Sequence, residues 1–222
     1  MILLGSIVNV VVGGLVGMFV GKLLPERLRT SVMAALSLMT IGIAVPGLLK
    51  SNNALIPIIS MVVGTLIGEL LDIDSAVNKL GEKLQKRFSG SRVTEGFVTG
   101  LLVFAVGALA VMGPLESGLQ HQHSLLFSKS VIDGVASIVF ASTMGLGVAL
   151  SGITVFVVEG SIALLASVVA PYLGEAVVNE ITFVGSLLIV GISLNLLGVT
   201  KLRILNMVPA ILLPILLCRF MG

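Results

Sequence analysis

Lys129 and Asp133 are the two charged residues of a stretch that otherwise looks lipid-soluble, SKSVIDGVASIVFAST at 128–143. Their spacing of four residues places both side chains on one face of a helix. A charge at membrane depth is costly, so it is kept there beside a partner, water or an ion. The two residues are therefore candidates for binding an ion or a polar solute. The alternative is a private ion pair in which Asp133 only neutralises Lys129.

The composition indicates that this stretch belongs to a membrane protein. The chain is 56% hydrophobic and 11% charged, with a mean hydropathy of +1.17, whereas about a quarter of the residues of soluble domains are charged. We expect an all-α polytopic membrane protein in which residues 1–222 form a single transmembrane domain. The net charge of +2 gives no support to a nucleic-acid partner. The single Cys218 excludes an internal disulfide and a multi-cysteine metal site.

Eight apolar segments are long enough to cross about 30 Å of hydrocarbon. They lie at about 2–24, 31–49, 54–71, 97–113, 125–150, 153–173, 181–198 and 202–221. The last segment carries Pro209 and Pro214, which remove backbone hydrogen bonds. We therefore expect it to be broken or re-entrant and to pack against protein. The chain is predicted to have seven to eight transmembrane segments.

The basic residues predict how the chain is oriented in the membrane. Ten of the thirteen Lys and Arg residues fall in three alternate connections: Lys22, Arg27, Arg29, Lys79, Lys83, Lys86, Arg87, Arg92, Lys201 and Arg203. Lys and Arg accumulate in the short loops on the cytoplasmic side. We therefore expect these connections in the cytoplasm and both termini outside.

The one long polar connection, at 73–92, is predicted to be an amphipathic helix on the cytoplasmic face. Apolar residues recur in it at helical spacing: Ile73, Val77, Leu80, Leu84 and Phe88. Such a helix is suited to docking a partner or an anionic lipid. The alternative is a solvated connector whose basic residues only fix the topology.

Glycines recur at intervals of one helical turn in two segments. Gly13, Gly17 and Gly21 follow one another in the first segment, and Gly64 and Gly68 in the third. Small residues at this spacing let two helix backbones approach closely within lipid. We expect these faces to pack within one chain, and packing between the chains of a homo-oligomer is the alternative.

The polar side chains in the apolar segments fall at two predicted depths. With about 1.5 Å of rise per residue, Asn9 and Asp133 lie about 10–12 Å below the outer surface. Glu159, Asn195 and Asn206 lie about 21–23 Å below it. Asp133 and Glu159 are then about 9 Å apart in depth. No basic residue is predicted beside Glu159, so we expect it to be protonated or to face water or a cation. Interhelical hydrogen bonds are the alternative for each asparagine.

Three further residues give weaker signals. Ser137 lies one turn below Asp133 and is suited to lining a polar cavity, although its hydroxyl can bond its own helix instead. His121 and His123 lie two residues apart without a third and fourth metal ligand. We therefore expect no metal site and no cofactor. The sequence has no nucleophile, phosphate-loop or metalloprotease motif, so an enzyme has no support.

Four segments taken together resemble a known protein family. They are LLPERLRTSVM at 23–33, VGTLIGELLDI at 63–73, KSVIDGVASIVFAS at 129–142 and LRILNMVPAILL at 202–213. The combination resembles the bacterial inner-membrane family of domain of unknown function 554, from about residue 2 to the C-terminus. The resemblance implies a multi-pass protein of the bacterial cytoplasmic membrane, in a family whose members are labelled permeases or transport proteins. It assigns no role to any residue.

These observations favour a secondary transporter or permease for a small solute or ion in the lipid bilayer. The predicted path consists of Asn9, Lys129, Asp133, Ser137, Glu159, Asn195 and Asn206. Asp133 is expected to face a hydrated cavity, with Lys129 as its countercharge. An ion or small-solute channel would use the same residues without alternating access. A non-transporting scaffold would instead use the 73–92 segment to bind a cytoplasmic partner.

Overall fold

The computed structural model describes residues 2–23, 25–77, 79, 93–105 and 108–221, and all regular structure in these ranges is helical. The long helices are α1 (Ile2–Lys22), α2 (Glu26–Leu48), α3 (Leu55–Leu71), α7 (Ser124–Met144), α8 (Leu146–Leu164) and α10 (Glu175–Leu196). The shorter helices are α5 (Val93–Ala105), α6 (Ala108–Gln120), α9 (Ala166–Val169), η1 (Ala170–Tyr172), α11 (Ile204–Met207), η2 (Val208–Ile211) and α12 (Pro214–Met221). The all-α prediction is confirmed.

The bundle is apolar on its outside and holds polar side chains inside. Large apolar side chains face outward on many helices, including Phe19, Leu70 and Phe220, which are 68%, 87% and 82% exposed. Several buried hydroxyls bond to carbonyls of their own helices; Thr40, for example, donates to the carbonyl of Leu36 at 2.7 Å. This arrangement suits a lipid environment, where apolar surface costs nothing and every polar group needs a partner.

The described helices include four that are long and apolar enough to cross a membrane. They are Thr30–Leu48, Ser124–Met144, Leu146–Leu164 and Glu175–Leu196, and the count rises to six if each of two bent pairs is one span. Two further apolar helices, Asn9–Gly21 and Leu55–Leu71, fall short of the required length. The prediction of seven to eight spans is therefore not confirmed.

Two segments are broken by sharp bends. The segment predicted as one span at 97–113 forms α5 and α6, and the axes of Val93–Ala105 and Leu109–Gln120 differ by 56°. The prediction of a broken last segment is confirmed, since Ile204–Ile211 and Pro214–Met221 differ by 44°. Pro209 lies in the 3-10 turn η2, and Pro214 begins α12. A proline cannot donate the hydrogen bond that would continue the helix, which explains the second break.

The boundary between the fifth and sixth predicted segments is wrong. The sequence pattern placed it between residues 150 and 153, but α7 ends at Met144 and α8 begins at Leu146. Gly145 makes the turn with a φ of 71°, a left-handed conformation that glycine adopts without a steric penalty. The whole of α8 is therefore displaced by several residues from its predicted register.

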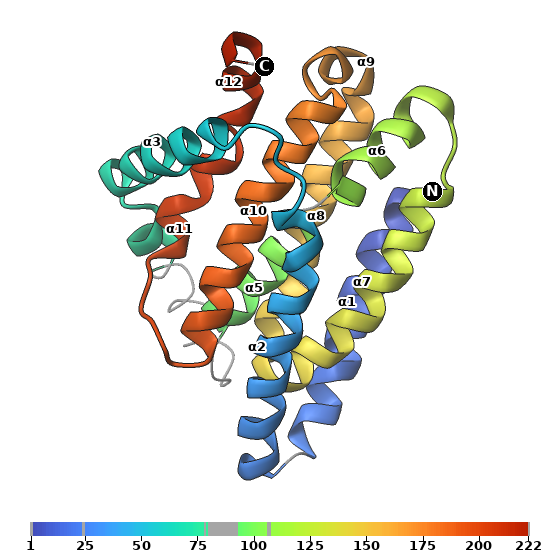
Figure 1. Cartoon of the computed structure of the whole chain (residues 1–222). Helices are drawn as coiled ribbons and strands as arrows, with labels where there is room; N and C mark the ends of the chain where they lie inside the picture. The colour runs from blue at the N-terminus through green and yellow to red at the C-terminus, as the bar shows by residue number, and fades with distance from the viewer. Residues whose placement is uncertain (1, 24, 78, 80–92, 106–107, 222) are drawn as a thin grey trace.

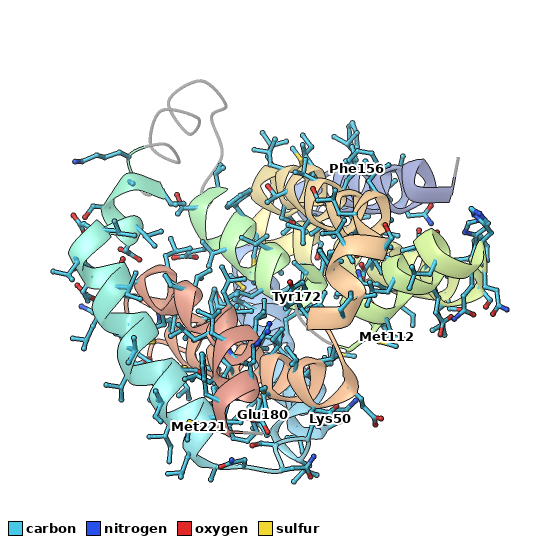
Figure 2. The ribbon with its side chains drawn as sticks, turned by 90° about the horizontal axis from the view of Figure 1, so that it is seen from above. Lys50, Met112, Phe156, Tyr172, Glu180 and Met221 are labelled. Carbon is cyan, nitrogen blue, oxygen red and sulfur yellow. The ribbon has the colours of Figure 1, made fainter. Side chains whose placement is uncertain are left out.

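The helices form two groups that share α5 and α2 as links. In the first group, α1 packs on α7 and α8, and α5 and α6 pack on α8. In the second, α10 packs on α2, and α3 packs on α11, η2 and α12. Seen from above, α3 and the C-terminal helices gather on one side and α1, α7 and α8 on the other (Figure 2). Contacts of α5 with α10 and of α2 with α7 join the groups.

The two ends of the chain lie in the upper half of the molecule in Figure 1. The C-terminal end of α1, the N-terminal end of α2 and the connection after α10, which together carry several of the basic residues, lie at the opposite, lower end (Figure 1). Basic connections that share one end agree with the predicted alternation, and the side of the membrane that they face stays a prediction. Of the predicted helix at 73–92, residues 78 and 80–92 lie outside the described residues. Ile73 and Val77 pack against the core beside α10.

Candidate functional site

Lys129 lies between two carboxylates inside the helix bundle. Its Nζ atom donates a hydrogen bond to Oδ2 of Asp133, one turn further along α7. The same Nζ atom lies 2.6 Å from Oε1 of Glu159, on α8. Lys129, Asp133 and Glu159 are 5%, 6% and 0% exposed. We call these three residues the Lys129 cluster.

The contact with Glu159 corrects the prediction that no basic residue lies at its level. Counted upward from the turn at Gly145 at about 1.5 Å per residue, Asp133 is at about 18 Å, Glu159 at about 21 Å and Lys129 at about 24 Å. Glu159 thus lies between the other two in height. The predicted separation of about 9 Å from Asp133 followed from placing the turn several residues too late.

The prediction that Asp133 faces a hydrated cavity is also not met in this structure. Its side chain is buried, and Lys129 occupies the position next to its carboxylate. Oε2 of Glu159 is buried and accepts no hydrogen bond from the residues that the structure describes. With all three groups ionised the cluster carries one net negative charge, which is expensive to keep in an apolar interior.

The close packing of α1 against α7 holds the other polar residues of this region. Asn9 donates from Nδ2 to Oγ of Ser130, the residue that follows Lys129, at 2.8 Å. The Asn9 side chain is therefore joined to the helix face beside the cluster. Ser137 donates to the carbonyl of Gly134 at 2.8 Å, so its hydroxyl is used by its own helix, as the alternative reading allowed.

The glycine faces pack within the chain, as expected. A Cβ atom on Gly13, Gly17 or Gly21 would overlap backbone or side-chain atoms of α7, and one on Gly64 or Gly68 would overlap the backbone of α11 and η2. These contacts let α1 approach α7 to the distance at which Asn9 reaches Ser130. They agree with the role of small residues in helix packing within lipid.

Asn195 and Asn206 do not belong to the Lys129 cluster. Oδ1 of Asn195 accepts hydrogen bonds from Leu202 N at 2.9 Å and Thr200 Oγ1 at 2.7 Å, so this side chain shapes the connection after α10. Oδ1 of Asn206 accepts from Asp74 N at 2.7 Å, and its Nδ2 is buried without a partner among the described residues. Both asparagines therefore form hydrogen bonds to connecting segments at the lower end of the second helix group.

A cavity of about 540 Å³ opens at this lower end between α5, α10 and residues 201–205. Its polar lining includes Asp74, Glu95, Asn195, Lys201 and Arg203. The sequence patterns did not identify this cavity, because it is formed by a connection and by the ends of helices far apart in the chain.

Arg203 joins this connection to the end of α3. It donates to Oε2 of Glu69 at 2.9 Å and to Oδ1 of Asp72, and Ser75 Oγ lies 3.3 Å from its Nη2. The hydrogen bond from Ser75, and with it the Arg203 guanidinium, holds the pKa of the Asp72 carboxyl below its ordinary value. Acidic residues at one-turn spacing near Asp72 were the signal in the sequence that could have suggested a basic partner.

Glu180 is a buried carboxylate that the sequence patterns placed in a connection. It is 3% exposed in α10, and its Oε1 accepts hydrogen bonds from the amides of Asn52 at 3.0 Å and Asn53 at 3.4 Å. Asn53 in turn donates to the carbonyl of Met221 at 3.2 Å. Figure 2 shows Glu180, Lys50 and Met221 close together at one edge of the molecule. This group ties the α2–α3 connection to α10 and α12.

The histidine pair in the α6–α7 connection has a local role. Nδ1 of His123 lies 2.8 Å from Oγ of Ser117, and His121 has a positive φ of 55°. Within the described ranges, no three His, Cys, Asp or Glu side chains gather as metal ligands.

Comparison with known proteins places the whole chain in one family. Residues 4–219 match the family described as "Protein of unknown function (DUF554)". The chain belongs to the DUF554 family. The resemblance seen in the four sequence segments is thereby confirmed, and the Lys129 cluster lies within the matched region.

Two relatives of this DUF554 protein extend along nearly its full length. It is 31% identical over 217 residues to the "Uncharacterized membrane protein YdfK" of Bacillus subtilis (strain 168), covering 95% of this chain and 93% of that protein. It is 26% identical over 220 residues to the "Uncharacterized protein YqgA" of Escherichia coli (strain K12), covering 95% and 94%. No solved structure matches the chain. The apolar helices and the first relative's name agree that this is a membrane protein.

Proposed function

We propose that this DUF554 protein is a secondary transporter for a small solute or ion in the bacterial cytoplasmic membrane. The observation that carries the proposal is the Lys129 cluster, in which three ionisable side chains meet inside apolar helices. Ionisable residues at membrane depth are rare, and they mark ion and substrate pathways.

Two further features support transport over a purely structural role. The bends between α5 and α6 and between η2 and α12 interrupt apolar helical segments, and interrupted helices are common around the binding sites of secondary transporters. The two helix groups share α5 and α2 as links, and a cavity opens at the lower end against α5 and α10. Relative movement of two such groups is one route to alternating access.

The burial of the cluster favours a transporter over a channel. Glu159 is 0% exposed, so a path through it is closed in this structure. A transporter passes through states that are closed on one or both sides, whereas a conducting channel needs a continuous open path. A scaffold that binds a partner through the 73–92 segment would not need the cluster to be ionisable.

The experiment is a flux measurement in proteoliposomes. Purified protein is reconstituted, and uptake is measured for a panel of isotope-labelled monovalent cations, amino acids and organic acids. Uptake of at least one compound that saturates with concentration supports a transporter, and uptake without saturation indicates a channel. Absence of uptake across the panel, with protein shown to be folded and inserted, would favour the scaffold.

The matched variants are Glu159→Gln and Glu180→Gln, because each removes one buried carboxylate from an upper part of the bundle. We expect Glu159→Gln to abolish uptake and Glu180→Gln to retain most of it. Equal loss in both variants would indicate that buried charge matters only for folding.

A further inference from the structure

We propose that the Lys129 cluster is a proton-binding site that holds one exchangeable proton on its two carboxyls. Proton binding itself follows from the geometry of the cluster. The use of that proton to drive a solute rests on the proposed transport function.

One bound proton would balance the charges of the Lys129 cluster. Lys129 supplies one positive charge, while Asp133 and Glu159 supply two negative charges when both are ionised. All three residues are at most 6% exposed, so water does not screen the excess. A buried charge without a counterion is strongly destabilising, and a carboxyl avoids this cost by taking up a proton. One proton makes the whole cluster neutral.

A proton fits this place better than a metal ion. The ammonium group of Lys129 already occupies the position between the carboxylates. The neighbouring hydroxyls are engaged, since Ser130 accepts from Asn9 and Ser137 donates to Gly134. A cation such as Ca²⁺ takes six to eight oxygen ligands, and Mg²⁺ needs near-octahedral coordination. Oε2 of Glu159, which accepts no hydrogen bond from the described residues, can take a proton on a lone pair without any rearrangement.

Other ionisable groups on the surrounding helices are few. The helices α7 and α8 contain no ionisable residues besides the cluster. The helices packed against these two carry Lys22 on α1, Glu26, Arg27 and Arg29 on α2, Glu95 on α5 and Glu116 on α6. Glu95 lies in the first turn of α5, where Val93 and Phe97 contact Gly147, so Glu95 lies about 18 Å below Glu159. Glu116 is half-buried near Gly118, whose neighbour on α8 is Ala163. Glu116 therefore lies on the part of α6 that packs against α8 beyond Glu159, and the experiment controls for it.

The test counts protonated carboxyls by infrared spectroscopy on the purified protein at neutral pH. A buried carboxylic acid gives a C=O stretching band that is separate from the carboxylate bands and shifts in D2O. If neutrality sets the proton count, Glu159→Gln and Asp133→Asn should each lose the band, because Lys129 then faces a single carboxylate. Lys129→Met should instead raise the band to about twice the wild-type intensity, since both carboxyls become neutral.

The controls are Glu116→Gln and Glu180→Gln, which should leave the band of the cluster unchanged. Loss of the band in Glu116→Gln would assign it to a different group and overturn the proposal. Absence of the band from the wild type, or no increase in Lys129→Met, would overturn it as well. The two carboxyl variants are interchangeable in this test, so a failure of one to fold leaves the other.

The readout separates the proton site from the transport function. If the infrared bands change as expected in the variants but no compound is taken up, the proton site is retained and transport is rejected. If the band is absent from the wild type and Glu159→Gln leaves the flux unchanged, the proton site is rejected and transport is retained.

Discussion

The Nζ atom of Lys129 on α7 lies 2.6 Å from Oε1 of Glu159 on α8. Lys129 is therefore the counterion of one carboxylate on its own helix and of another on the neighbouring helix. Removing Lys129 and Asp133 together would leave Glu159 without its counterion. A variant that tests for a purely structural ion pair must therefore neutralise all three side chains.

Lys129→Met is expected to destabilise the protein, because both buried carboxyls must then be protonated at neutral pH, without the ion pair that Lys129 provides in the wild type. Breaking a buried ion pair by removing one partner costs about 3–5 kcal/mol. The triple variant Lys129→Met, Asp133→Asn, Glu159→Gln removes every charge and should recover most of the lost stability. Thermal unfolding can be followed with a thiol-reactive dye at Cys218, the single cysteine of the chain.

The triple variant also separates structure from function. We expect it to be folded and inactive in proteoliposomes. A stable triple variant with full flux would reduce the cluster to a structural feature and remove the basis of the proposed function.

Gly17→Ala is expected to weaken the packing of α1 on α7. A Cβ atom at this position would overlap the backbone carbonyl of Ile138, and overpacking of this kind costs about 1–3 kcal/mol. Gly42→Ala is the matched control, because Gly42 lies on the exposed face of α2 with no atom near its Cβ position. Alanine in a helix interior is favoured over glycine by about 0.5–1 kcal/mol. The same dye assay should rank Gly17→Ala below the wild type and Gly42→Ala at or above it.

The contacts of Asp72 with Ser75 and Arg203 predict a pH dependence at the lower end of the bundle. Because the pKa of Asp72 is lowered in the folded protein, the ionised carboxylate stabilises the connection after α10. This stabilisation is fully present above the ordinary aspartate pKa of about 3.9. The stabilisation is lost as the pH falls through the lower pKa that Asp72 has in the folded protein. Hydrogen exchange of residues 197–203, corrected for the intrinsic pH dependence, should increase only in that acidic range.

Asp72→Asn imitates the protonated state and should produce the same increase at neutral pH. Arg203 also contacts Glu69, and its Nε lies 3.8 Å from Oδ2 of Asp74. An unchanged exchange rate in this variant would show that these two carboxylates are sufficient to hold Arg203. The global unfolding temperature should move little, since these side chains are largely exposed and exposed ion pairs contribute weakly.

The predicted orientation can be tested by labelling introduced cysteines in intact cells. In a Cys218→Ser background, His121→Cys lies in the connection between α6 and α7, and Val199→Cys lies in the exposed connection after α10. A membrane-impermeant thiol reagent should label position 121 from outside and reach position 199 only after the cells are opened. The reverse pattern would place both termini in the cytoplasm.

The sequence by itself determined the features that depend on local composition and spacing. It predicted an all-helical membrane protein of the DUF554 family. The glycine intervals predicted which faces of α1 and α3 pack closely, because small side chains act through the helix period alone. Pro209 and Pro214 predicted the broken last segment, because a missing backbone donor acts at its own position.

Only the tertiary structure decided which polar side chains meet. The contact between Lys129 and Glu159 depends on the register of two helices, and that register is set by a single turn at Gly145. Apolar residues lie on both sides of this turn, so hydropathy gave no sign of its position, and an error of several residues put Glu159 about 9 Å from Asp133 in predicted depth. Asn195 and Asn206 were placed wrongly for a related reason. Their partners lie in connections, and hydropathy and periodicity do not predict how connections fold back on the helix ends.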